Sequence, residues 1–329
     1  MKPADKIRQA IKEVVGKNID FVVEHPADES HGDYATNVAM MMKGNPRELA
    51  QDLAEELKKS DILGEVVDLS RIEVAGPGFI NFWLKEEWLA GEVKRVLDQK
   101  EDYGRNEWLK VKKVMVEFTD PNPFKEFHIG HLMSNGIGES LARLFEFSGA
   151  DLKRACYQGD VGMHVAKAVW GLSQMMKQDK LSLELLEEKS LEERVHYLGQ
   201  SYSFGTTKYE EDEKVKQEMN LLNKTIYEKS DEQVNKIYGV GREWSLAYFE
   251  TIYKKLGTKF NYYFFESEAG QIGKAVVEEN KNVFEKSEGA IVFEGEKYGL
   301  HTRVFLNSLG LPTYEAKELG LAKLKEEAC

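Results

Sequence analysis

Two histidines that stand three residues apart, His128 and His131, carry the strongest chemical signal in this 329-residue sequence. At the start of a helix, this spacing lets both imidazoles point the same way and donate hydrogen bonds to one phosphate. Gly130 between them removes a side chain where a nucleotide would approach closely, and Lys125 adds a mobile positive charge just before them. A helix N-terminus itself offers unpaired N–H groups and positive potential, so the segment predicts a nucleotide phosphate site.

A strand, a loop and a helix must position these residues. The apolar run 114–118 predicts a short buried strand, the prolines of 120–123 interrupt it, and a helix opens at His128. One apolar face of this helix, the pattern of a helix that packs on a core, is predicted from Ile137, Leu141, Leu144 and Phe145. Gly149 is expected to end the helix, and residues 152–157 form a second strand. This βαβ order places the loop at the carboxyl edge of a parallel sheet, where such folds bind ligands.

The histidine pair also has simpler interpretations. Two histidines near a helix start are common as surface residues, and they can be a metal-binding pair. A zinc site needs further Cys, His or carboxylate ligands. None lies nearby at metal-ligand spacing, so no protein-bound metal is expected.

The residues around the histidines form a longer motif. Phe127-His-Ile-Gly-His131 resembles the HIGH signature of class I aminoacyl-tRNA synthetases, and Glu117-Phe-Thr-Asp-Pro-Asn-Pro-Phe-Lys125 resembles its arginyl-tRNA synthetase version. The resemblance implies an α/β fold, with a Rossmann-type parallel sheet and a helical insertion, preceded by a small α+β domain. The implied N-terminal domain is 1–104, and 105–329 is part of a catalytic domain whose insertion spans about 165–255.

The resemblance also implies roles for individual residues. Catalysis is assigned to Lys125, His128 and His131. ATP binding is assigned to Pro123, His128, Gly130 and His131. Arginine binding is assigned to Glu117, Asn122, Asp160, Tyr314 and Glu318. Carboxylates suit this ligand because planar, bidentate pairing separates arginine from lysine. Mg²⁺ would travel with ATP rather than occupy a cage of protein ligands.

Several positions depart from the family pattern. Glu318 stands where the family has Asp, and its extra methylene leaves pocket depth and ligand choice open. Lys317 stands where the family has Arg, and Glu126 where it usually has Pro. Val161 and His164 replace the usual Trp and Gln in a Gly-Asp-x-Gly loop, which puts the contacts of those two positions in doubt.

Two segments near the N-terminus extend the resemblance. Gly32-Asp-Tyr-Ala-Thr-Asn37 and Gly76-Pro-Gly-Phe-Ile-Asn-Phe82 resemble the additional N-terminal domain of arginyl-tRNA synthetases, which meets the D-loop of tRNA. Phe79 and Asn81 occupy the places whose side chains stack on and hydrogen-bond a D-loop base. The alternative is that Phe79 is a core residue and Asn81 a strand-end residue.

The composition limits the kinds of partner and cellular compartment that are expected for this chain. The net charge of −12 argues against nucleic-acid binding by overall charge, so a tRNA partner is expected only from the resemblance. Two cysteines provide no disulfide framework, and no apolar run reaches membrane-spanning length. A cytoplasmic monomer without membrane contact is expected.

The leading expectation is an arginine–tRNA ligase, or a portion of one, that uses ATP, L-arginine and tRNA(Arg). A portion, or else a split or shortened paralogue, is expected because nothing corresponds to the family's later catalytic part, its KMSKS-like loop or its anticodon-binding domain. One alternative is a synthetase-like protein that binds nucleotide or tRNA without charging it. The other is a different class I nucleotidyl-transfer enzyme that acts on a small acid.

Overall fold

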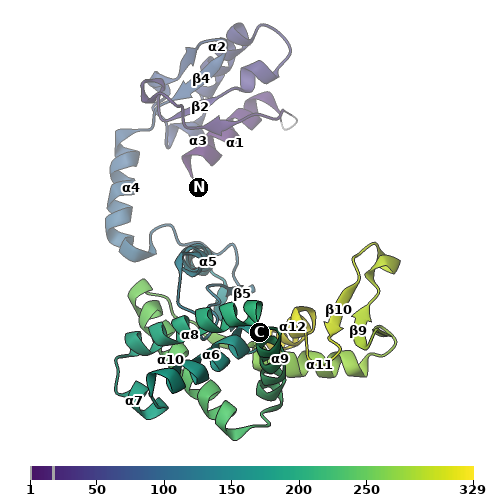
Figure 1. Cartoon of the computed structure of the whole chain (residues 1–329). Coiled ribbons are helices and arrows are strands. Elements are labelled where there is room, and N and C mark those ends of the chain that lie inside the picture. Colours follow the sequence, from purple (N-terminus) through teal and green to yellow (C-terminus); the bar gives the residue numbers. More distant parts are fainter. Residues whose placement is uncertain (1, 17–18) are drawn as a thin grey trace. The chain divides into compact units, whose positions relative to one another are not determined.

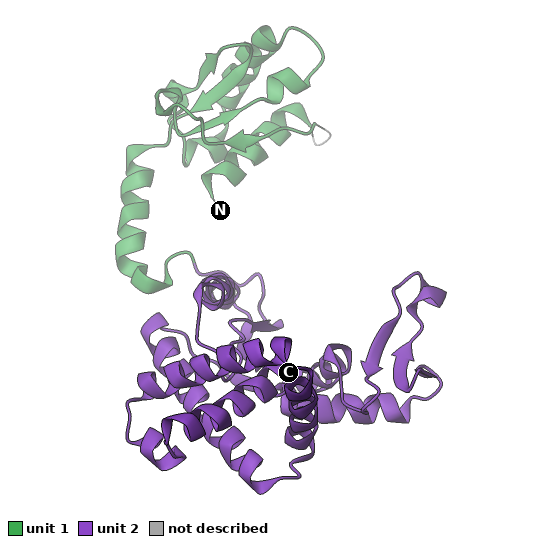
Figure 2. Cartoon of the chain, viewed as in Figure 1, with its two compact units in different colours: residues 1–104 green, residues 105–329 purple. Residues whose placement is uncertain are grey.

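The structure, a computed structural model, describes residues 2–16 and 19–329. It divides the chain into two compact units, Met1–Gly104 and Arg105–Cys329, which are coloured separately in Figure 2. Each unit has its own hydrophobic core. Figure 1 labels the helices and strands of both units.

Unit 1 is built on a four-stranded antiparallel sheet with strand order β1-β2-β4-β3. Its strands are β1 (Val23–Glu24), β2 (Tyr34–Thr36), β3 (Glu73–Ala75) and β4 (Phe79–Phe82). Its α-helices are α1 (Pro3–Val15), α2 (Pro46–Leu57), α3 (Asp61–Gly64) and α4 (Glu86–Gln99). In the segment 71–83, Gly76-Pro-Gly78 separates two strand-forming runs, which predicts a strand, a tight turn and a strand, and the antiparallel pairing of β3 with β4 confirms this.

Local sequence accounts for the first two helices. Ile7 and Ile11 lie one turn apart on α1 and are both buried in the core of unit 1. The Asn45 side chain caps α2 by accepting a hydrogen bond from the Arg47 N–H at 3.1 Å, and Pro46 takes the first helical position. Asn followed by Pro predicts a helix start at these positions from the sequence alone, and the structure confirms it.

Unit 2 contains a three-stranded parallel sheet with strand order β5-β6-β7. Its strands are β5 (Lys113–Glu117), β6 (Asp151–Gln158) and β7 (Tyr262–Phe265). Helix α5 (Ile129–Phe147) joins β5 to β6, which confirms the predicted βαβ order, and Gly149 at φ +91° ends the turn after it. Among the described residues β5 pairs only with β6 and is therefore an edge strand. Its residues are half-buried or exposed, whereas a buried strand was expected.

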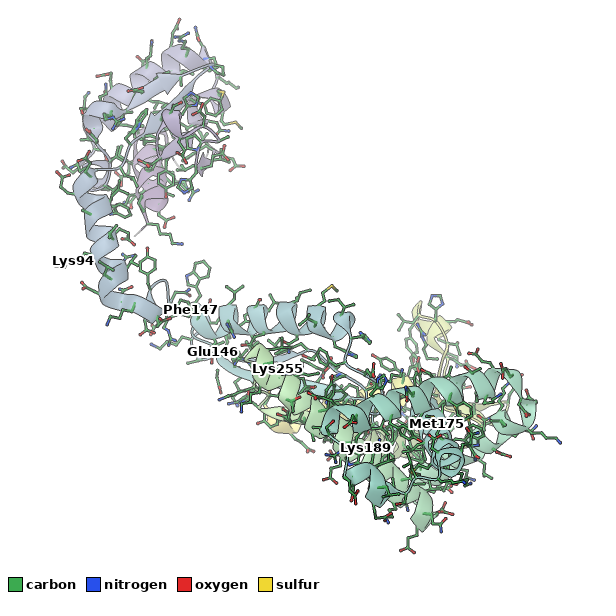
Figure 3. All side chains as sticks on the ribbon, turned by 60° about the vertical axis from the view of Figure 1, so that its left-hand side comes forward. Lys94, Glu146, Phe147, Met175, Lys189 and Lys255 are labelled. Atoms are coloured by element: carbon green, nitrogen blue, oxygen red, sulfur yellow. The ribbon has the colours of Figure 1, made fainter. Side chains whose placement is uncertain are left out.

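The chain between β6 and β7 is helical. Its helices are α6 (Met163–Asp179), α7 (Leu183–Glu187), α8 (Leu191–Glu211), α9 (Glu213–Glu228) and α10 (Glu232–Leu256). Their shared core includes Val165, Val169, Leu172, Leu198 and Trp244. Figure 3 shows the side chains on these elements, with Met175 on α6 and Lys255 at the end of α10.

The last part of unit 2 carries two long helices and a small antiparallel sheet. These elements are α11 (Glu266–Glu279), β8 (Glu285–Ser287), β9 (Ala290–Phe293), β10 (Arg303–Leu306) and α12 (Tyr314–Ala328). α11 and α12 cross closely, because a Cβ on Gly273 would lie 1.7 Å from the Ala316 carbonyl oxygen. A Cβ on Gly320 would lie 1.9 Å from the Ala269 carbonyl oxygen. Glycines at these two positions therefore allow α12 to pack closely against α11.

The apolar face predicted for α5 is wrong. Ile137, Leu141 and Leu144 are 55%, 44% and 65% exposed, and only Phe145 of the predicted set packs against a core. The buried residues of this helix are Asn135, Gly138, Glu139 and Ala142. Hydrophobic periodicity fails here because half of the buried face is polar.

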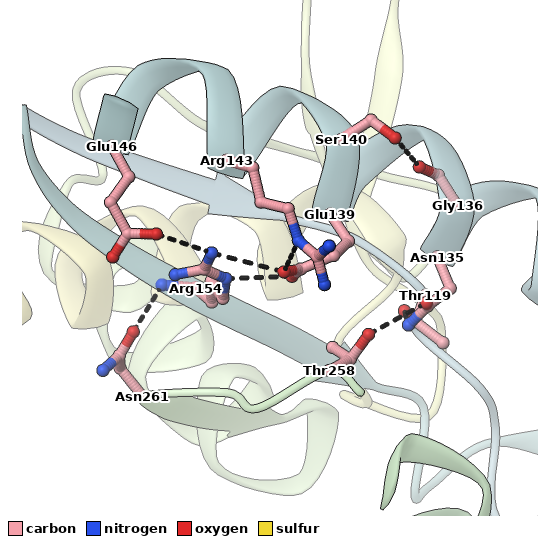
Figure 4. A network of polar contacts seen from close by, with 10 residues as sticks. All are labelled: Thr119, Asn135, Gly136, Glu139, Ser140, Arg143, Glu146, Arg154, Thr258 and Asn261. Carbon is pink, nitrogen blue, oxygen red and sulfur yellow. Dashed lines mark hydrogen bonds and ion pairs between the residues drawn. The ribbon is translucent and has the colours of Figure 1, made fainter. Parts of the chain in front are cut away.

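Paired polar groups make this burial possible (Figure 4). The Glu139 carboxylate accepts a hydrogen bond from Arg154 Nε on β6 at 2.9 Å. Asn135 donates to the Thr119 hydroxyl at 2.9 Å and accepts from the Thr258 hydroxyl at 3.0 Å. Buried polar groups with partners avoid most of the desolvation cost, so polar side chains hold α5 on the sheet.

Replacing Gly138 with alanine is expected to destabilise unit 2 by about 2–3 kcal/mol. The new Cβ would lie 2.2 Å from Phe118 Cγ, and Phe118 is only 3% exposed and has little room to move. Gly136→Ala on the same helix is the matched control, because its Cβ would meet nothing within 4 Å. It should stabilise the helix by about 0.5–1 kcal/mol. Urea unfolding of both variants measures the difference, and equal effects would show that the Phe118 contact is unimportant.

Candidate active site and family membership

His128 and His131 form a reciprocal cap at the start of α5. His128 is the N-cap residue, and its Nδ1 accepts a hydrogen bond from the Gly130 N–H at 3.1 Å. The Nδ1 of His131 accepts one from the His128 N–H at 3.2 Å, and the two rings stack with centroids 3.8 Å apart. Because a backbone N–H can only donate, each neutral ring carries its hydrogen on Nε2. The pair therefore offers two Nε2–H donors, which suit an acceptor such as a phosphate oxygen.

The positive charge of this site does not come from His131. Burial, with smaller contributions from His128 and Lys125, lowers the pKa of His131 to about 4, so that this ring is neutral at pH 7. Lys125 provides a charge instead, with its Nζ 4.8 Å from the centre of the Tyr202 ring on α8. Pro123 is buried in the same loop. The α5 N-terminus adds the positive potential of the helix dipole.

The loop between β5 and α5 is tied to the next strand. Asp120 and Phe124 have φ values of +46° and +67°, which non-glycine residues rarely adopt. The Asp120 carboxylate accepts a hydrogen bond from the Tyr157 N–H at 2.7 Å, and Asn122 Oδ1 accepts one from the Gly159 N–H at 3.1 Å. Both donors lie at the carboxyl end of β6, so the loop sits at the sheet edge that the βαβ order predicts.

Carboxylates from β5 and α12 come close together beside this loop. Glu117 ends β5, while Tyr314 and Glu318 lie one turn apart on α12. Burial and then the negative charge of Glu117 raise the pKa of Glu318, and a hydrogen bond with Tyr314 opposes that rise. Burial is also the main cause that raises the pKa of Asp120 to about 7, and Glu117 adds to it. A cation would relieve the repulsion among these groups.

Two lysines of α12 already offset part of this negative charge. Lys317 Nζ lies 2.6 Å from Glu266 Oε2, and Lys325 Nζ lies 2.9 Å from Glu117 Oε2. Neither Glu266 nor Lys325 is among the predicted site residues. The segment 256–270 resembles a family segment that ends in Glu-Ser, here at 266–267, but no role was assigned to it, and no motif marks Lys325. The signal that could have indicated Lys325 is its spacing, seven residues after Glu318, which puts both on one helix face.

Asp160 makes its contacts with the protein itself. Its side chain is fully buried, and one oxygen accepts hydrogen bonds from Arg242 Nε and the Ser267 hydroxyl, both at 2.8 Å. The other oxygen accepts from the Ser267 N–H at 2.8 Å. These partners belong to α10 and α11, so Asp160 ties three segments together. Arg242 lies 82 residues away in the chain, and no sequence pattern pairs the two.

The residues that depart from the family pattern also have protein partners. His164 Nε2 lies 2.8 Å from the Gly159 carbonyl oxygen, and burial lowers the pKa of His164 to about 4. Val161 is buried in the core of the helical region. Glu126 Oε1 lies 2.8 Å from His196 Nδ1 on α8. At these three positions, the side chains that differ from the family pattern are held by packing or by polar contacts with the protein.

Unit 1 has a separate cavity of about 680 Å³. Phe79 and Asn81 both line it, together with His25 and Pro77. Asn81 is only 3% exposed, and its side chain makes no hydrogen bond to any described residue. An amide that lines a cavity and has no hydrogen-bond partner among the described residues can bond to a ligand that offers both a donor and an acceptor.

Three further features of residues 2–16 and 19–329 bear on metal sites, membrane-spanning helices and disulfides. No three His, Cys, Asp or Glu side chains in this part of the chain are grouped so that they could hold a metal ion. None of its helices is long and apolar enough to cross a bilayer. Cys156 is buried and Cys329 is exposed, and both are free thiols.

Two family models match the chain in succession. The model for the arginyl tRNA synthetase N-terminal domain matches residues 2–84. The model for the class I (R) tRNA synthetase catalytic domain matches residues 92–328. Together they cover both structural units.

Individual relatives agree with these matches. An arginine–tRNA ligase of Oceanobacillus iheyensis is 29% identical over 320 residues, which are 93% of this chain and 53% of that protein. One from Staphylococcus carnosus is 34% identical over 179 residues, which are 50% of this chain and 31% of the relative. The chain thus spans about half the length of a curated relative that matches it almost throughout.

The fold has solved counterparts. The crystal structure of arginyl-tRNA synthetase from Plasmodium falciparum superposes with a TM-score of 0.62 at 20% identity, over 98% of this chain and 56% of the other. At this identity the likeness supports the fold alone. Because the catalytic-domain model covers most of the sequence, the chain belongs to the class I arginyl-tRNA synthetase family.

Proposed function

We propose that this chain carries the amino-acid and ATP sites of an arginine–tRNA ligase. The observation that carries the proposal is that Glu117, at the end of β5, lies close enough to Glu318 of α12 to add to the rise in pKa that burial causes there, while the loop that follows β5 leads to the histidine cap of α5. Burial and the negative charge of Glu117 raise the pKa of Glu318, a cation would relieve the repulsion between the two carboxylates, and arginine supplies a planar one. The cap supplies donors for the phosphates of the nucleotide that activates it.

The proposed reaction has two steps. First, the arginine carboxylate attacks the α-phosphorus of ATP, the bond to the β-phosphate oxygen breaks, and pyrophosphate leaves with the displaced electron pair. Second, a terminal ribose hydroxyl of tRNA(Arg) attacks the arginyl carbonyl, loses its proton, and AMP leaves. Positioning and charge stabilisation supply most of the catalysis in such transfers.

Each residue has a proposed part in the first step. The Nε2–H groups of His128 and His131 donate to oxygens of the reacting phosphate. Lys125 is proposed to lie on the side of the departing pyrophosphate. A Cβ on Gly130 would lie 3.0 Å from His128 Cε1, so glycine at this position leaves room for the His128 ring. Pro123 shapes the loop from its buried position. Mg²⁺ would arrive on ATP, which carries most of its ligands.

The amino acid is proposed to lie between the loop and α12. Glu117 and Glu318 hold the guanidinium, with Tyr314 orienting Glu318. Asn122 already accepts from Gly159, so its free amide N–H groups are left for the ligand. We propose that Asp160 acts indirectly, by positioning the start of α11 through Ser267. The proposed setting is a cytoplasmic monomer, and light scattering of the purified chain tests the oligomeric part.

Calorimetric titration with arginine, lysine and citrulline tests the proposed function. Arginine should bind at least tenfold more tightly than citrulline, which has the same shape without the charge. Lysine should be intermediate, because its ammonium keeps the charge but not the fork of donors. Glu117→Gln should remove most of the preference for arginine. Equal affinity for arginine and citrulline would contradict the pocket assignment.

ATP–pyrophosphate exchange with arginine and tRNA(Arg) separates catalysis from binding. Exchange above background supports a ligase. Retained arginine binding without exchange would favour the synthetase-like protein that binds without charging. Exchange that does not depend on tRNA and accepts another small acid would favour a different nucleotidyl-transfer enzyme.

Unit 1 is proposed to bind a base of the tRNA D-loop in its cavity. Phe79→Ala should weaken binding of tRNA(Arg) about tenfold, since stacking on an aromatic ring contributes about 1–3 kcal/mol per base. Asn81→Ala should weaken it by about a similar factor, because the base would lose its hydrogen bonds to the amide. Gln51→Ala, at an exposed position of α2 that does not line the cavity, is the control. Fluorescence anisotropy with labelled tRNA at fixed salt gives the dissociation constants. Wild-type affinity in both cavity variants would remove this site from the proposal.

A further inference from the structure

The last turns of α12 reach back to the end of β5. Lys325 Nζ lies 2.9 Å from Glu117 Oε2. Two neighbouring contacts hold the end of the helix there: the Tyr262 hydroxyl donates to the Ala328 carbonyl at 3.0 Å, and Leu321 is buried against the sheet. A lysine of the chain itself thus stands at the carboxylate that is proposed to bind the arginine side chain.

This contact satisfies the charge of Glu117 but not its hydrogen-bonding capacity. Glu117 Oε2 is buried, and within the described residues it has no hydrogen-bond partner of acceptable geometry, although the ammonium is close. The hydroxyl of Tyr157 is also buried without a partner in that part of the chain. The charges of Glu117 and Glu318 both act on this hydroxyl, which places it in the same cluster. A planar guanidinium, with five donors in a fixed fork, fits an unsatisfied carboxylate oxygen better than an ammonium does.

The other lysine of α12 differs in its freedom to move. The Lys317 side chain is 10% exposed and lies 2.6 Å from Glu266. The Lys325 side chain is 33% exposed, so solvent lies beside it and it can leave Glu117 without crossing the core. Lys317 is therefore a fixed counter-charge, whereas Lys325 is an exchangeable one.

We propose that Lys325 occupies the guanidinium subsite when arginine is absent, as an internal competitor that arginine displaces from Glu117. The inference rests on the proposed function, because it needs Glu117 to be an arginine contact. Arginine brings one positive charge as the ammonium of Lys325 leaves, so the charge of the cluster is preserved. A neutral analogue such as citrulline brings none, and Glu117 would then be left unpaired. Lys325 thereby acts as a specificity-determining residue.

A graded series at position 325 tests the proposal by calorimetry with L-arginine. Lys325→Met removes the competing charge and keeps the length of the side chain, so the dissociation constant for arginine should fall about two- to fivefold, the range expected for a partly exposed ion pair. Lys325→Arg places a guanidinium against Glu117 and should raise the dissociation constant above that of the parent chain. Lys323→Met, at an exposed position of the same helix, should change nothing.

The outcomes separate the inference from the proposed function. A merely structural role for Lys325 would give the reverse order, with weaker binding in Lys325→Met and rescue in Lys325→Arg, and this order overturns the inference. Equal affinities across the series also overturn it, while the proposed function stands. Arginine binding to none of the chains overturns both. Circular dichroism melting of each chain checks folding, and Lys325→Gln replaces the Met variant if that one unfolds.

Discussion

Replacing both His128 and His131 with alanine is expected to slow arginine-dependent ATP–pyrophosphate exchange by about three orders of magnitude. The two Nε2–H groups are the donors that the cap leaves for the phosphate, and alanine supplies none. The exchange rate with saturating arginine and tRNA(Arg) measures the effect, and calorimetry with ATP reports the loss in binding separately.

The structure also predicts a cost in stability for this variant. Each Nδ1 accepts a backbone N–H at the start of α5, so the alanine pair removes the cap and costs about 1–2 kcal/mol. The control is His128→Asp with His131→Glu, because these side chains complete a capping box and, as carboxylates, have no N–H to donate to a phosphate. This control should keep the stability and lose the exchange activity. Near-parental exchange in a folded control would remove the histidines from the chemistry.

Replacing Asp120 with asparagine is expected to stabilise unit 2 at pH 8 by about 3 kcal/mol. Burial raises the pKa of this carboxyl to about 7; the negative charges of Glu117 and Glu318 add to it, whereas the Tyr157 N–H and Lys325 oppose it. Asparagine keeps an oxygen for the Tyr157 N–H and tolerates φ +46°, but it carries no charge to bury.

The direction in which stability changes with pH follows from how many protons the folded and unfolded chains bind. Between pH 4 and 7 the folded chain holds a proton on Asp120 that the unfolded chain releases, so the free energy of unfolding falls as the pH rises through this range. Asp120→Asn should flatten that part of the pH profile and should have little effect near pH 4. Urea unfolding at pH 4, 6 and 8 measures the three values. Asp98→Asn, at an exposed position of α4, is the control, and a profile as steep as that of the parent would refute the assigned protonation.

Local sequence was sufficient to predict the features that depend on a few consecutive residues, namely where helices begin and end and where a strand is interrupted. The strand, the proline-containing loop and the helix that opens at His128 were predicted correctly, because breaks and caps act within a few residues. The same is true of Asn45 and Pro46 at the start of α2, and of Gly149 after α5. The motif around His128 also indicated the family that the matches confirm.

Tertiary structure decided which side of α5 is buried and which charges meet. Leu141 is exposed and Glu139 buried because the sheet offers Arg154 to the carboxylate, a partner that periodicity cannot reveal. Glu117 and Lys325 lie more than two hundred residues apart, and only the docking of α12 brings them within 2.9 Å. The physical reason is that hydrophobic periodicity indicates only which side chains gain free energy by leaving water. The burial of Glu139 and the pairing of Glu117 with Lys325 depend instead on charged partners that distant segments supply.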